Sequence, residues 1–253
     1  MLDHLKNTIV LTISLGGYAL FSMYRFSVGV VLLEVQPAFG IDKFEAGLLV
    51  SVHSVAMAIS TITSGTLSDR FGTRKIHSIG ILTLSSGLFL SFTAENYVLL
   101  LTHTLLAGIG SGALVSALYT ELGSHYPSSR AFLLGLASFA FSIGGFLGPW
   151  IAGVIMSEYG WRSVFLLLSF IGYLLFVLRL IFRFNKTVHS KPTLKEGNHV
   201  AVDYQNSVRR NTILIYLTML LSNIAYFSIV TWTPEFLVVN QDMNLAESGF
   251  AMA

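Results

Sequence analysis

Three ionisable side chains lie inside long apolar stretches of the sequence. Arg25 falls within residues 8–33, and His53 and His103 fall within two later stretches. A charge at the centre of a membrane helix costs about 2.5–3.5 kcal/mol on insertion scales, so such residues are functional candidates. A guanidinium binds carboxylate or phosphate through paired hydrogen bonds, and a histidine can relay protons near neutral pH. The alternatives are a structural arginine paired with a carboxylate or backbone carbonyls, and histidines that only support packing.

Uncharged polar residues on the same kind of stretch could complete a binding cavity. We expect Tyr18, Tyr24, Asn223 and Tyr226 to supply polar contacts to a small-molecule substrate. The alternative is that most of them satisfy neighbouring groups between helices.

The composition decides what kind of element must position these residues. The chain is 53% hydrophobic and only 11% charged, whereas soluble domains carry about 25% charged residues. A membrane helix needs roughly 20 apolar residues, and barrel strands would alternate apolar and polar side chains instead. The sequence therefore predicts an all-α integral membrane protein with about seven full spans, at residues 8–33, 44–67, 76–93, 97–120, 131–156, 164–182 and 211–236.

Charges between the spans predict the topology. Lys and Arg concentrate in alternate loops, notably 68–75 and 179–210, while the loops 34–45 and 237–247 are acidic. Basic loops face the cytoplasm, so we expect a multi-pass protein of the plasma or inner membrane with a cytoplasmic N-terminus. Basic clusters between apolar runs favour contact with membrane lipid over nucleic acid.

The long polar segment after the sixth span divides the chain. We expect a six-span bundle at 1–184, a cytoplasmic linker at 185–210 and an incomplete second bundle at 211–253. Residues 44–49 and 246–251 share an apolar-Glu-small-Gly pattern after an acidic loop, and internal repeats are typical of transporters. Because the sequence stops just inside an eighth span, we expect a fragment that lacks a C-terminal half.

Sequence motifs of the common enzyme classes are absent. The chain has no cysteine, and neither a nucleophile elbow, a P-loop nor a zinc-protease motif occurs in it. We therefore expect no enzyme activity, no cofactor and no metal site.

The loop between the second and third spans reads Gly65-Thr66-Leu67-Ser68-Asp69-Arg70-Phe71-Gly72-Thr73-Arg74-Lys75. It resembles the G-x-L-x-D-R-x-G-x-R-K signature of the major facilitator superfamily at every fixed position. Gly65 permits close helix contact, Gly72 permits a tight turn, and the basic residues hold the loop in the cytoplasm. Glu121, at the end of span four, is expected to pair with Arg130 or with the arginines of this loop as a conformational latch.

Two further patterns compare with the same family. In span five, Gly135, Gly144, Gly148, Pro149 and Gly153 resemble a glycine motif associated with antiporters, and we expect them to serve close packing first. In span four, Thr104 stands where the pattern R-x-x-x-G, counted back from Gly108, has an arginine tied to proton transfer. That departure puts proton coupling in doubt or moves it elsewhere, with His53 and His103 as candidates.

The resemblance implies secondary active transport by alternating access between two six-helix bundles. The segment around Arg25 resembles span one of organic-anion and organophosphate carriers, and a single arginine suits a monocarboxylate better than a phosphate dianion. We therefore expect a small organic anion as substrate, coupled to a proton or another ion. The alternatives are a drug–proton antiporter, and a non-transporting membrane protein that pairs with a separate partner. Residues 1–253 alone are not expected to transport.

Overall fold

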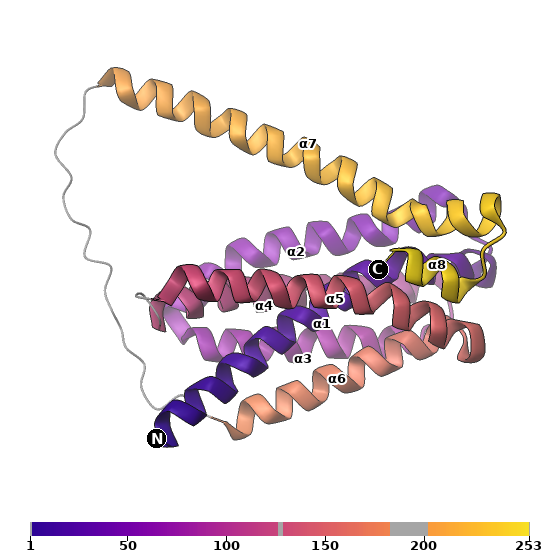
Figure 1. Cartoon of the computed structure of the whole chain (residues 1–253), viewed down its shortest axis with the longest axis horizontal. Helices are drawn as coiled ribbons and strands as arrows, with labels where there is room; N and C mark the ends of the chain where they lie inside the picture. Colours follow the sequence, from indigo (N-terminus) through magenta and orange to yellow (C-terminus); the bar gives the residue numbers. More distant parts are fainter. Residues whose placement is uncertain (1, 126–128, 183–201, 253) are drawn as a thin grey trace.

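The computed structural model describes residues 2–125, 129–182 and 202–252. These form only helices, which confirms the all-α prediction, and seven of the described helices are long and apolar enough to cross a membrane (Figure 1). The helices are α1 (Leu2–Phe39), α2 (Lys43–Phe71), α3 (Thr73–Phe92), α4 (Tyr97–His125), α5 (Arg130–Tyr159), α6 (Trp161–Ile181), α7 (Val202–Gln241) and α8 (Leu245–Met252).

Most of the expected linker lies outside the described residues. Positions 185–201 are not described, and positions 202–210 belong to α7 rather than to an extended segment. Within α7, the described residues Leu214–Gln241 are long and apolar enough to cross a membrane.

α1 continues beyond the predicted end at residue 33, because its last polar residues have partners. The Glu34 carboxylate accepts a hydrogen bond from the Trp161 backbone N–H at 2.8 Å, which satisfies one of the free N–H groups at the start of α6. Arg162 beside it donates to the Ala94 carbonyl at 2.9 Å. These contacts tie the end of α1, the α3–α4 turn and the start of α6 together.

The two copies of the repeated sequence pattern, at residues 44–49 and 246–251, each lie at the start of a helix. Before α2, the Asp42 carboxylate accepts from the Glu45 N–H at 2.8 Å, and Glu45 accepts from the Asp42 N–H at 3.0 Å. Before α8, Asn244 and Glu247 make the same reciprocal pair at 2.9 and 3.0 Å. Each pair is a capping box, which satisfies free backbone donors at the helix N-terminus. The glutamate of the repeated pattern is thus the third residue of each helix.

Small residues bring α4 between α2 and α3. A side chain at Gly108 or Gly112 would collide with α2, and one at Gly110 would collide with the backbone of α3 near Leu84. Such close approach is how helices associate in lipid, where burial of apolar side chains gives little driving force. Fully buried leucines, among them Leu20, Leu88, Leu114 and Leu168, fill the centre of the bundle.

The glycines of span five serve two interfaces of α5. Gly144 and Gly148 lie against the α1 backbone at Ala19 and Met23. Gly153 lies against the start of α8, and Pro149 of the same motif meets Gly249 of α8. Gly135 has no neighbour within contact distance, so the expected packing role does not extend to it.

The described contacts of α7 with the six-helix bundle come from its C-terminal part. Its N-terminal part stands away from α1–α6, and the helix bends before it meets α8 (Figure 1). Gly29 of α1 makes the approach possible, because a side chain there would meet the Val230 and Thr231 carbonyls and the Pro234 ring. Pro234 cannot donate to the Val230 carbonyl within α7, which accounts for the bend.

Candidate functional site

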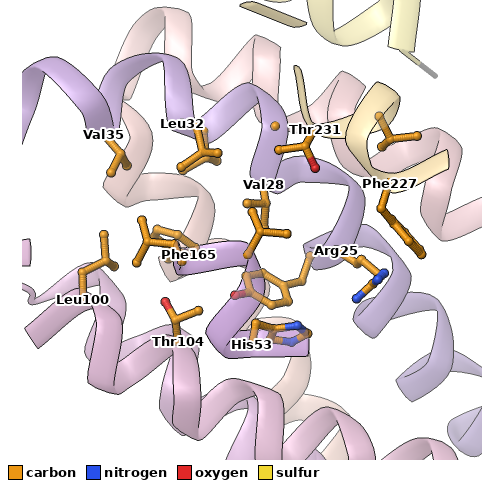
Figure 2. Close-up of a pocket in the computed structure, with 16 residues that line it drawn as sticks. Arg25, Val28, Leu32, Val35, His53, Leu100, Thr104, Phe165, Phe227 and Thr231 are labelled. Atoms are coloured by element: carbon orange, nitrogen blue, oxygen red, sulfur yellow. The ribbon is translucent and has the colours of Figure 1, made fainter. Parts of the chain in front are cut away.

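A pocket lies where α7 meets the six-helix bundle. Its walls come from α1, α2, α4, α6 and the C-terminal part of α7, and the cavity holds about 40 Å³, room for a few water molecules. Figure 2 shows Arg25 and His53 at one end and Val35 and Leu100 at the other. The lining residues are Tyr24, Arg25, Val28, Gly29, Val31, Leu32, Val35, Leu49, Val50, His53, Leu100, Thr104, Phe165, Phe227, Val230 and Thr231.

Arg25 points toward α7. Its guanidinium carbon lies 3.7 Å from the centre of the Phe227 ring, a cation–π contact that is stronger away from water (Figure 2). The ring covers the face of the guanidinium, whereas the N–H donors point outward in its plane. The edge that binds a carboxylate is therefore not the part that Phe227 covers.

No carboxylate among the described residues forms an ion pair with Arg25. The two ion pairs found within the described residues are Lys43–Glu235 and Glu121–Arg179, and no acidic residue lines the pocket. The pairing of Arg25 with a protein carboxylate, the alternative that the sequence leaves open, is therefore absent from the described part of the chain. The pocket is a positively charged site with neutral walls.

Four other polar side chains line the pocket, those of Tyr24, His53, Thr104 and Thr231. Tyr24 is buried, with its hydroxyl beside that of Thr104. The buried His53 ring lies 5.1 Å from the Tyr24 ring centre, and its Nε2 lies 3.2 Å from the Ser111 hydroxyl. Since Ser111 donates to the Ala107 carbonyl at 2.9 Å, His53 Nε2 is the donor in its contact with Ser111.

The other substrate and coupling candidates do not line the pocket. Tyr18 shares a hydrogen bond of 3.1 Å with Tyr119, and its ring packs at a tilt against Phe141. Asn223 is exposed and donates to the Met219 carbonyl of its own helix at 2.8 Å. Tyr226 packs on Phe26 and lies near enough to Arg25 to interact with its charge, and His103 lies beside the Leu90 backbone of α3. None of these four lines the pocket, so of the seven candidates the structure gathers Arg25, Tyr24 and His53.

Glu121 has a different partner from those expected. Its carboxylate accepts from the Arg179 guanidinium at 2.7 Å, and both side chains are buried. Arg179 also donates to the Ser14 hydroxyl at 2.8 Å and to the Val10 carbonyl at 3.2 Å. Arg130 is exposed at the start of α5 instead. The pair joins α4 and α6 to α1 inside the bundle, and Arg179 is not a loop charge.

The loop that carries the family-like signature turns sharply between α2 and α3. Gly72 has φ +91°, a value that side-chain-bearing residues rarely adopt. Asp69, Arg70 and Lys75 are exposed, and Arg74 donates to the Arg179 carbonyl at 3.5 Å. Gly65 lies beside Ser116 of α4, which a side chain at Gly65 would touch without collision. Within the described residues, Asp69 makes no ion pair.

Phe227, Thr104 and the apolar lining residues of the pocket were not selected from the sequence. Phe227 is adjacent to the predicted Tyr226, and one position along a helix turns the side chain by about 100°. Thr104 stands at the arginine position of the span-four pattern, and that position lines the pocket. The threonine leaves Arg25 as the one lysine or arginine among the residues that line the pocket.

Comparisons with known proteins agree on one family. Residues 14–253 match the profile described as Major Facilitator Superfamily. The chain is 26% identical over 165 residues to the multidrug resistance protein Stp of Mycobacterium tuberculosis, covering 64% of this chain and 31% of Stp. It is 24% identical to the hexuronate transporter of Bacillus subtilis, covering 95% and 58%. It is 27% identical to the cis,cis-muconate transport protein of Acinetobacter baylyi, covering 85% and 54%.

Solved structures agree on the fold. A bacterial homologue of the human lysosomal transporter Spinster, in an inward-facing and unoccupied conformation, superposes with a TM-score of 0.83 at 17% identity. The alignment covers 97% of this chain and 58% of that one. The chain thus spans between about a third and three fifths of the length of these similar proteins.

Proposed function

Because this chain belongs to the Major Facilitator Superfamily, a family of transporters and not of enzymes, we propose that it binds a small organic anion at Arg25 for secondary transport. The observation that carries the proposal is Arg25 itself, which lies in a membrane-spanning helix, lines a pocket and has no ion pair with a described carboxylate. Such a charge is costly in a membrane unless it serves a ligand or a partner. A carboxylate ligand would supply the missing partner.

The position of α7 suggests how the site is reached. Phe227, Val230 and Thr231 form the α7 side of the pocket, and the N-terminal part of α7 stands away from the bundle (Figure 1). In alternating access, a site at the interface opens to each side in turn. We propose that movement of α7 and α8 relative to α1–α6 uncovers Arg25. This movement is the step of the transport cycle that opens the Arg25 site.

His53 is the better candidate for a coupling proton. It shares the pocket with Arg25, whereas His103 faces α3. A proton on His53 would add a second positive charge beside a bound anion, which links protonation to substrate binding. Topology completes the proposal: a cytoplasmic N-terminus, in the plasma or inner membrane, follows from the basic loops.

A drug–proton antiporter is the second candidate, favoured by the similarity to a protein named for multidrug resistance. The pocket argues against lipophilic cations as ligands, because its charged lining residue is positive and no acid faces it. Comparing the binding of an anion with that of a cation of similar size distinguishes the two functions. The third candidate, a membrane protein that only pairs with a partner, predicts no saturable binding of either ion.

The test is binding of a matched anion and cation to the purified chain in lipid nanodiscs. Benzoate and benzyltrimethylammonium have similar size and opposite charge. We expect saturable binding of benzoate and no saturable binding of the cation, after subtraction of binding to empty nanodiscs. Preference for the cation would favour the antiporter. Saturable binding of neither ion would overturn the proposal.

A further inference from the structure

The pocket extends well beyond the group that would hold an anion. Arg25 and Val35 are ten positions apart on α1 (35 − 25), and a helix rises 1.5 Å per residue, so the two Cα positions are about 15 Å apart. Val28 and Leu32 lie between them at helical spacing and face the same pocket. Figure 2 shows the four side chains along one side of the cavity.

The far end of the pocket is apolar on every described side. Leu32, Val35 and Leu100 are almost fully buried, as is Leu49 from α2. The Phe165 ring closes that region from α6 (Figure 2). Of the polar lining side chains, His53 lies beside Arg25, whereas Thr104 and Thr231 lie between the two ends of the pocket (Figure 2). The pocket therefore has a charged head region and an apolar tail region.

We propose that the pocket selects a monoanion with an extended apolar tail, such as a medium-chain monocarboxylate. The inference rests on the proposed anion site at Arg25 and adds the orientation of the ligand. The carboxylate binds the free edge of the guanidinium, and the tail runs along α1 toward Val35. Burial of the tail is favourable because it removes apolar surface from water.

The same geometry excludes ligands that are polar at both ends. A second carboxylate at the Val35 end would be buried without a partner, and so would the hydroxyl groups of a sugar acid. The pocket of about 40 Å³ is smaller than the whole ligand. The wall that yields is α7, which meets α1 at the close contact of Gly29 and through Tyr226 and Phe227, whose rings contact Phe26 and Arg25.

The experiment is a chain-length series on the purified full chain in lipid nanodiscs. Binding of radiolabelled hexanoate, octanoate, decanoate and decanedioate is measured by equilibrium dialysis, and uptake by empty nanodiscs is subtracted. Each added methylene is expected to tighten binding by up to about fourfold. Decanedioate is expected to bind about tenfold or more weakly than decanoate, because its second carboxylate would lie among apolar side chains.

Two valine-to-threonine variants locate the tail. Val35→Thr places a hydroxyl at the end of the tail region and should weaken decanoate about fivefold or more, and hexanoate less. Val30→Thr is the control, because Val30 is equally buried on α1 but does not line the pocket. We expect it to leave the chain-length series as in the wild type.

The outcomes separate this inference from the anion site itself. Equal affinities for hexanoate and decanoate, or equal affinities for decanoate and decanedioate, would overturn the tail region while leaving Arg25 as an anion site. The tail region would also be overturned if Val30→Thr removed the dependence of affinity on chain length as completely as Val35→Thr does. If Arg25→Gln binds every acid as well as the wild type does, the anion site is wrong, and the tail region that is inferred from it is wrong too.

Discussion

Arg25 and Arg179 are both membrane-embedded arginines, and the structure gives them opposite surroundings. Arg179 is fully buried and joined to Glu121, Ser14 and the Val10 carbonyl. Arg25 is covered on one face by Phe227 and lines a pocket. An arginine whose donors are used by the protein serves structure, whereas one whose donors face a pocket can bind a ligand. This contrast is the chemical basis of the proposed site.

The buried Glu121–Arg179 pair leads to a stability prediction. Glu121→Gln leaves the Arg179 charge buried without its counter-ion and should lower the free energy of unfolding by about 3–5 kcal/mol. The double variant Glu121→Leu with Arg179→Met replaces both charges by apolar groups and should regain most of that loss. Thermal unfolding in detergent measures both effects.

Glu158→Gln provides the control for this pair, because Glu158 is an exposed carboxylate near the end of α5. We expect it to leave the unfolding temperature unchanged. A double variant less stable than Glu121→Gln would show that the pair is needed for more than charge balance.

His53 leads to a prediction about pH. Gln at position 53 can still donate to the Ser111 hydroxyl, which lies 3.2 Å from His53 Nε2, but it cannot take up a proton. If His53 carries the coupling proton, benzoate binding to His53→Gln should lose the dependence on pH that the wild type shows. Benzoate titrations at several pH values, with His103→Gln in parallel, measure this. An identical pH profile in wild type and His53→Gln would exclude the role.

At the scale of the helices, the sequence predicted the number of spans and missed several of their ends. Hydropathy located all seven stretches, because a run of apolar side chains is a local property. It ended the first span at residue 33, although α1 continues to Phe39. The continuation depends on the bond between Glu34 and the Trp161 N–H, which joins residues far apart in the chain and has no local signal.

The glycines of α5 allow a matched packing test. Gly148→Ala adds a methyl group against the Met23 backbone, whereas Gly135→Ala adds one in open space. We expect the first change to cost about 1–3 kcal/mol, as overpacking usually does, and the second to be neutral or slightly stabilising, since alanine favours helix. Unfolding temperatures of the two variants in the same detergent provide the comparison. Equal temperatures would mean that α1 and α5 can separate without cost.

At the scale of the whole molecule, the site depends on how α7 meets the bundle. Arg25, Tyr24 and His53 could be selected from the sequence because polar groups in apolar spans are rare. Phe227 and the apolar end near Leu100 could not, because which face of α7 meets α1 depends on long-range packing. Long-range packing also explains why Arg179 is predicted to be a loop charge from the sequence but is buried against Glu121 in the structure.

An ion pair at the α2 N-terminus holds α7 against the bundle. Lys43 Nζ lies 2.9 Å from Glu235 Oε1, with Lys43 mostly exposed and Glu235 mostly buried. Partly exposed pairs contribute about 0.2–1 kcal/mol. Glu235→Gln should therefore open this end and speed entry into the pocket by about 1.5- to fivefold. A larger factor would mean that more than this pair holds α7.

Cysteine labelling measures that opening cleanly, because the natural chain has no cysteine. A cysteine introduced at Val35 in the pocket is treated with a charged, water-soluble maleimide, with and without Glu235→Gln. Glu158→Gln, which removes a carboxylate away from α7, is the control and should not alter the rate. Slower labelling in Glu235→Gln would contradict the role of the pair.

The most direct test of the central claim is benzoate binding to the wild type and to three arginine variants in nanodiscs. The account predicts that Arg25→Gln abolishes saturable binding, and that Arg25→Lys weakens it about tenfold, because lysine keeps the charge but lacks the paired donors of the guanidinium. Arg130→Gln, which removes an exposed arginine outside the pocket, should bind as the wild type does. Wild-type affinity in Arg25→Gln would contradict the account.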